Sequence, residues 1–82
     1  MENQVLILEN IQDKVYADSG VTYRPTGIKY IEMVLRMSSE LIKAVDIDSI
    51  TPEVKAKLTD DNYHMIVHAI DCVMQIDKYS YR

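Results

Sequence analysis

The chain contains 82 residues with 48% apolar side chains, no Phe or Trp, and a formal net charge of −4. This length suits one small domain spanning residues 1–82, whose core must be built from aliphatic side chains and Met. The acidic balance argues against a DNA or RNA binder, because such proteins usually carry a basic excess.

Cysteine usage and hydropathy restrict the class of protein further. Cys72 is the single cysteine, so a disulfide framework is excluded and the thiol is expected to be buried as a small apolar group. No stretch reaches the roughly 20 apolar residues of a membrane span, and the start of the chain lacks the layout of a signal peptide. We therefore expect a cytoplasmic protein (in the host cytoplasm, if the chain is viral) with no membrane partner.

The first segment, residues 2–16, is predicted to be a helix. Residues 5–8 form a continuous apolar run, which a short strand would also explain. However, Leu8, Ile11 and Val15 continue the apolar pattern at helical spacing, which favours the helix over the strand. The following residues, 17–25, contain turn formers and a proline and are predicted to be a connector.

The second helix is predicted to begin at Thr26, a good N-cap residue, and to run to about Asp46. Gly27 is a local weakness just inside its start. The polar residues of this segment form one stripe at helical spacing: Lys29, Glu32, Arg36, Ser39, Glu40 and Lys43. Most of the remaining residues are apolar, which predicts a helix covered over a broad part of its surface.

A short third helix is predicted from the run Thr51-Pro52-Glu53, which supplies an N-cap, a proline at the first helical position and an acid in the first turn. It should end near Leu58. Thr59 is then expected to cap the last helix, with Asp60 and Asp61 at its positive end.

The last helix, from about residue 60 to residue 82, has a narrow polar stripe on an otherwise apolar surface. Its polar residues are spaced by three or four: His64, His68, Asp71, Gln75, Lys78 and Arg82. The two long helices are expected to pack as an antiparallel hairpin and to bury their remaining apolar flanks on another copy. We therefore predict an all-α homo-oligomer whose interface follows residues 65, 69, 72 and 76, or residues 34, 37 and 41.

Several groupings of polar residues are better explained by local structure than by chemistry. His64 and His68 share a helix face with Asp71, but we expect a polar seam there and no metal, since the glutamate of a zinc-protease helix is missing. The aspartates at 46 and 48 and at 60 and 61 suit turns and helix ends. No Gly-rich phosphate loop or nucleophile motif is present. We expect neither an enzyme nor a bound cofactor.

Tyrosines stand beside cations at two places, Tyr23-Arg24 and Tyr79-Ser80-Tyr81-Arg82. A base can stack on a tyrosine ring, and phosphate can be held by Arg or Lys and by the free N–H groups of a helix start. The alternative is that the tyrosines border a hydrophobic interface and the cations keep it soluble. The residues predicted to bind a ligand lie around the first of these places: Tyr23, Arg24, Thr26, Lys29, Tyr30 and Arg36.

The segment Tyr23-Arg24-Pro25-Thr26, followed by a helix with Tyr30 and Arg36, resembles the opening of the phage anti-CBASS protein 2 family. Cys72-Val73-Met74 stands where that family has an Ala-Val-Met-like run. The resemblance covers about two-thirds of the chain, from Tyr23 onward. It implies a small helical oligomer that sequesters cyclic oligonucleotide signals, with Tyr23 stacking on a base.

Two positions depart from the pattern of that family. Met37 stands near the place of the family's basic residue in the first long helix, with Arg36 adjacent. The final helix has Gln75-Ile76-Asp77 in place of a run of small residues.

Two functions are therefore carried forward. The first is a non-enzymatic homo-oligomer that binds a cyclic di- or trinucleotide at subunit interfaces, as a phage counter-defence protein would. The second is a protein-interaction module, or an inhibitor of a host protein, that acts through an apolar helix face.

Overall fold

The computed structural model describes the backbone of residues 2–79 and the side chains of residues 4–76. Within residues 2–79 it contains four α-helices, one short 3-10 helix and no strand. In chain order these are α1 (Glu2–Ser19), α2 (Gly27–Ala44), η1 (Ile47–Ser49), α3 (Pro52–Asp60) and α4 (His64–Tyr79). The all-α class is confirmed, and the first segment is a helix rather than a strand. The predictions on Lys78 and on residues 79–82 lie outside the described side chains.

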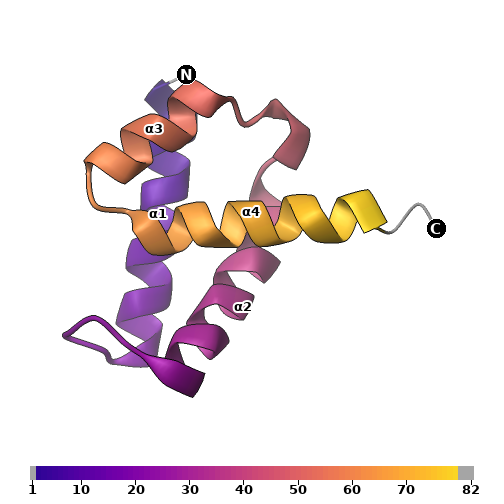
Figure 1. The fold of residues 1–82 in the computed structure, drawn as a ribbon. Coiled ribbons are helices and arrows are strands. Elements are labelled where there is room, and N and C mark those ends of the chain that lie inside the picture. The colour runs from indigo at the N-terminus through magenta and orange to yellow at the C-terminus, as the bar shows by residue number, and fades with distance from the viewer. Residues whose placement is uncertain (1, 80–82) are drawn as a thin grey trace.

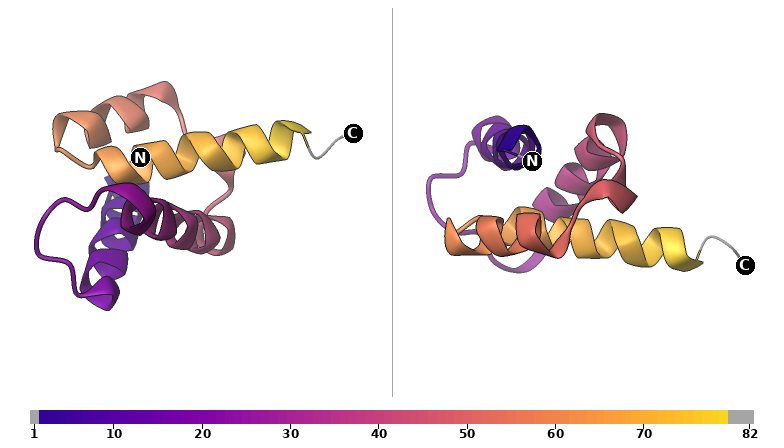
Figure 2. Two further views of the ribbon diagram at one scale, coloured as in Figure 1. Left: turned by 60° about the horizontal axis from the view of Figure 1, so that its bottom comes forward. Right: turned by 90° about the horizontal axis from the view of Figure 1, so that it is seen from above.

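The helices form two layers (Figures 1 and 2). α1 and α2 diverge from the connector that joins them, and α3 and α4 lie together across one side of that pair. The predicted antiparallel hairpin of α2 and α4 is wrong, because α4 crosses α2 and also contacts α1, α3 and η1. The physical reason is that α1 carries its own apolar line, and α4 can cover the lines of both α1 and α2 only by lying across them.

The buried side chains form one aliphatic and Met-rich cluster to which all four α-helices contribute. Its largest fully buried members are Leu8, Met33, Met37, Leu41, Val54, Leu58, Ile66 and Ile70. Most residues of the two apolar lines predicted to form an interface between copies are instead buried in this core. Residues 34, 37 and 41, together with 65 and 69, are at most 6% exposed, so only positions 72 and 76 remain outside it. No helix within the described residues combines the length and the hydropathy that crossing a bilayer requires.

The helix-start signals were partly right. Thr51 caps α3, since its Oγ1 accepts a hydrogen bond from the Val54 N–H at 3.2 Å. Thr26 occupies the N-cap position of α2 without a side-chain cap bond. Thr59 is a correction: it lies inside α3 and its hydroxyl donates to the carbonyl of Lys55 at 2.9 Å. Asp61 consequently follows the end of α3 rather than opening α4.

α4 is capped by a side chain from another helix. After α3 the chain turns at Asn62, whose φ of 69° lies in the left-handed region that Asn tolerates. The N–H of Ile66, in the first turn of α4, then donates to Oε1 of Gln12 on α1 at 2.9 Å. The first N–H groups of a helix have no partner within it, so the buried amide of Gln12 satisfies one of them and fixes α4 to α1.

Candidate functional site

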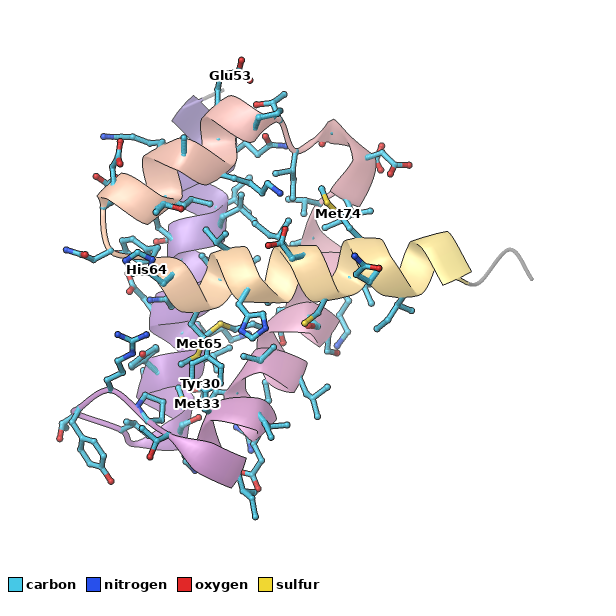
Figure 3. The ribbon with its side chains drawn as sticks, viewed as in Figure 1. Tyr30, Met33, Glu53, His64, Met65 and Met74 are labelled. Atoms are coloured by element: carbon cyan, nitrogen blue, oxygen red, sulfur yellow. The ribbon has the colours of Figure 1, made fainter. Side chains whose placement is uncertain are left out.

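A pocket of about 400 Å³ lies between the end of α1, the connector and the start of α4. We call it the tyrosine pocket. It is lined by Gln12, Tyr16, Val21, Thr22, Tyr23, Arg24, Tyr30, Asn62, His64 and Met65. Figure 3 places Tyr30 beneath α4, with His64 and Met65 at the beginning of that helix. Three of the predicted ligand-binding residues, Tyr23, Arg24 and Tyr30, are therefore brought together.

None of the described residues that line the tyrosine pocket is acidic, although the chain carries 13 Asp and Glu. Arg24 supplies a cation, and it takes part in no ion pair between described side chains. His64 adds a ring nitrogen that can donate a hydrogen bond. The start of α4 borders the pocket as well, and its first N–H groups favour negative charge. The lining is thus suited to an anion.

The three tyrosines of the pocket have different roles. Tyr23 is 74% exposed, so its ring stands at the rim with its faces open for stacking. Partial burial raises the pKa of Tyr16, and Arg24 nearby opposes this rise; the phenol therefore stays neutral near physiological pH. The hydroxyl of Tyr30 lies 2.9 Å from Nδ1 of His68, and their ring centroids are 5.7 Å apart. Tyr30 is thereby held as a wall of the pocket.

The other three predicted ligand-binding residues lie elsewhere. Thr26 and Lys29 do not line the tyrosine pocket, and Lys29 pairs with Glu32 at 3.9 Å. Arg36 borders a separate depression beside Glu40. The helix start at the pocket is that of α4 rather than that of α2. Sequence reasoning therefore missed several lining residues of the tyrosine pocket: Gln12, Tyr16, Asn62 and Met65. Among these four, only Asn62 carries a local sequence signal, since Asn favours turns.

The predicted polar seam of α4 faces outward, since His64, His68, Asp71 and Gln75 are all exposed. His64 borders the tyrosine pocket, whereas His68 is paired with Tyr30. Asp71 forms a salt bridge with Lys55 at 2.9 Å, which ties α4 to α3. Among the described residues, no three His, Cys, Asp or Glu side chains are grouped closely enough to hold a metal ion.

A second, larger groove of about 580 Å³ lies between α1 and α3. Its floor is apolar and its rim is acidic, with Glu9, Glu53 and Asp61 around Lys57. Partial burial raises the pKa of Glu9, and the nearby Asp61 carboxylate raises it further, while Lys57 opposes this rise. Lys57 pairs with Asp61 at 3.4 Å, so the one cation of this groove is already engaged.

The raised pKa of Glu9 predicts a pH-dependent stability. A carboxyl group whose folded-state pKa is raised stabilises the fold while it is protonated, and this contribution is lost as the pH rises through the folded-state pKa. We therefore expect Glu9→Gln to raise the melting temperature near neutral pH and to have little effect near about pH 4. Thermal unfolding followed by circular dichroism measures this.

Glu53→Gln is the matched control in the same groove. Glu53 lies in the first turn of α3, where a negative charge is favourable, so its neutralisation should lower the melting temperature near neutral pH. A Glu9→Gln variant that also loses stability would contradict the assigned repulsion.

Comparisons of the whole chain with protein-family models, with curated proteins and with solved structures find no significant match.

Proposed function

We propose that the chain is a non-enzymatic, homo-oligomeric binding protein that captures a nucleotide in the tyrosine pocket. The observation that carries the proposal is the lining of this pocket: three tyrosines and Arg24, with no carboxylate, on a chain of net charge −4. Aromatic faces and a guanidinium that forms no ion pair with a described side chain suit a ligand that has both a flat base and a phosphate. The resemblance from Tyr23 onward adds the expectation of a cyclic di- or trinucleotide signal, sequestered by a phage counter-defence protein.

The expected binding mode follows from the positions of the groups. A base stacks on Tyr23 at the rim, where the ring is exposed. The phosphate is held by Arg24, whose planar guanidinium can donate two parallel hydrogen bonds, with the start of α4 and His64 close by. Ligand pockets usually measure about 300–1,000 Å³. At about 400 Å³ the pocket accommodates one nucleotide unit, and the rest of a cyclic oligonucleotide would lie across the rim.

Calorimetry with a panel of cyclic di- and trinucleotides tests the proposal. Tyr23→Ala should weaken binding by about 1–3 kcal/mol, the usual contribution of one base–aromatic stack. Arg24→Ala should also weaken binding and should reduce its dependence on salt, because a charge-assisted phosphate contact is lost.

Lys57→Ala is the control, since it also removes one positive charge but from the groove between α1 and α3, outside the tyrosine pocket. The nucleotide affinity of this control variant should equal that of the wild type. The proposal fails if no nucleotide of the panel binds, or if Tyr23→Ala and Arg24→Ala bind as tightly as the wild type does.

A protein-interaction module is the second candidate, and one observation favours it. Several large apolar side chains of α2 are exposed, among them Ile28 at 77% and Ile42 at 66%. An apolar helix face of this kind is a common docking surface for another protein. If no nucleotide of the panel binds, protein binding through this apolar face of α2 becomes the better account of the function.

A further inference from the structure

The exposed apolar residues of α2 lie on one side of the helix. Ile28, Ile31, Leu35 and Ile42 are spaced by three, four and seven residues, which places them on a single line. They are 77%, 58%, 62% and 66% exposed, respectively. We call these four residues the outer α2 face. It is separate from the buried line of α2 formed by Met33, Met37 and Leu41.

A groove of about 210 Å³ runs alongside the outer α2 face, where α4 crosses α2. It is lined almost entirely by apolar atoms, from Tyr30, Ile31, Val34, Leu35, His68 and Cys72. Ile76 is 63% exposed one turn beyond Cys72 on α4 and extends the same apolar surface. The outer α2 face, a ridge of Ile and Leu side chains, therefore lies beside an apolar groove that can receive side chains of this kind.

We propose that a second copy of this chain covers this surface, with the two α2 helices antiparallel and the two-fold axis close to Leu35. A two-fold interface pairs the same patch of both copies. Here the ridge of one copy would enter the groove of the other, and Ile28 would meet Ile42 of the second copy. This inference rests on the oligomeric part of the proposed function and does not depend on the nucleotide.

The order of charges beside the outer α2 face selects the antiparallel arrangement. The residues Lys29, Glu32, Arg36, Glu40 and Lys43 alternate in sign along the helix. With the axis near Leu35, an antiparallel pair brings Lys29 close to Glu40, and Glu32 close to Arg36, of the second copy. These contacts would be shared with the ion pairs within one copy, Lys29–Glu32 at 3.9 Å and Lys14–Glu40 at 3.8 Å. In a parallel two-fold pair the charged flanks of the two helices would lie on opposite sides of the seam, so only the antiparallel pair brings opposite charges together.

The heptad spacing and the exposed area support a second copy as the occupant. The positions 28, 31, 35, 38 and 42 follow the a/d pattern of a two-helix seam. Ser38, the small residue in this pattern, is already buried within one copy at 7% exposure, and its hydroxyl donates to the carbonyl of Val34 at 2.8 Å, so the seam is formed by the other four positions. The outer α2 face and Ile76 present five large apolar side chains that are each at least 58% exposed. Pairing the same patch of two copies would cover all five on both chains at once, which is the kind of surface from which specific interfaces are built.

The interface would also touch the candidate site, because Tyr30 lines both the groove and the tyrosine pocket. A second copy seated in the groove covers the outer side of this ring. The wall of the pocket would then be held by the dimer as well as by the hydrogen bond to His68.

Analytical ultracentrifugation at micromolar concentration tests the interface. The wild type should sediment as a dimer, and Leu35→Glu should sediment as a monomer with unchanged helix content, since Leu35 is not part of the monomer core. Leu6→Glu is the matched control: Leu6 is exposed to a similar degree, 55%, but lies on α1, and this variant should remain a dimer. A monomeric wild type, or a dimer that survives Leu35→Glu, would overturn the proposal.

Disulfide trapping tests the orientation of the helices. In a Cys72→Ser background, chains with Ile28→Cys and chains with Ile42→Cys are mixed and oxidised. The mixed disulfide should predominate over the 28–28 and 42–42 disulfides, because only sites close in space can be bridged. Predominance of the like pairs would show a parallel arrangement and overturn the antiparallel one. If the wild type is a monomer that binds a nucleotide, the proposed dimer interface is wrong, while the nucleotide-binding proposal still stands.

Discussion

Replacing Leu41 by Asp is expected to unfold the protein, whereas the same replacement at the next residue, Ile42, should leave the monomer folded. Leu41 is fully buried, while Ile42 is 66% exposed. Removing a buried Leu side chain costs about 2–5 kcal/mol, and a buried, unpaired carboxylate adds its own desolvation cost. Since a small domain has a total stability of about 5–15 kcal/mol, the loss at Leu41 approaches the whole stability of the fold.

Circular dichroism and urea unfolding measure both variants. Leu41→Asp should show little helix and no cooperative transition, and Ile42→Asp should unfold cooperatively with a midpoint near that of the monomeric Leu35→Glu variant. Ile42→Asp should also disrupt the dimer, because Ile42 belongs to the outer α2 face. If both variants unfold, the assignment of α2 to an inner and an outer apolar line is wrong.

Gln12→Ala is expected to destabilise the protein by about 1–3 kcal/mol, the cost of leaving a buried hydrogen-bonding group without its partner. The group concerned is the N–H of Ile66, which donates to the Gln12 side chain at 2.9 Å. The variant should lose stability in the first turn of α4 as well as in the fold as a whole. Amide hydrogen exchange in the first turn of α4 should accelerate more than exchange in the middle of α2.

Two other variants make this measurement specific. Gln12→Glu keeps an acceptor oxygen in the same place and sets a negative charge at the positive end of α4, so near neutral pH it should recover part of the lost stability. Gln75→Ala removes an exposed glutamine from α4 and should change the unfolding midpoint little. Equal midpoints for Gln12→Ala and Gln75→Ala would show that the bond between α1 and α4 contributes nothing.

The sequence by itself determined the four α-helices of the described residues, although not the start of α4 or the short 3-10 helix. The apolar spacing of Leu8, Ile11 and Val15 predicted α1 correctly, and the Thr-Pro-Glu run predicted the start of α3, because these signals act between residues three or four apart. It also predicted six ligand-binding residues around the connector, of which three, Tyr23, Arg24 and Tyr30, line one pocket. Neighbours in sequence that flank one turn cannot lie far apart.

Only the tertiary structure decided which apolar line of a helix is inside. α2 is apolar on two sides, and the crossing by α4 buries Met37 and Leu41 while leaving Leu35 and Ile42 exposed. The same crossing brings His64 to the tyrosine pocket and sets Gln12 at the start of α4, from positions about fifty residues apart. Helix periodicity records which residues share a face, but the choice of neighbour for each face depends on how all four helices fill one small core together.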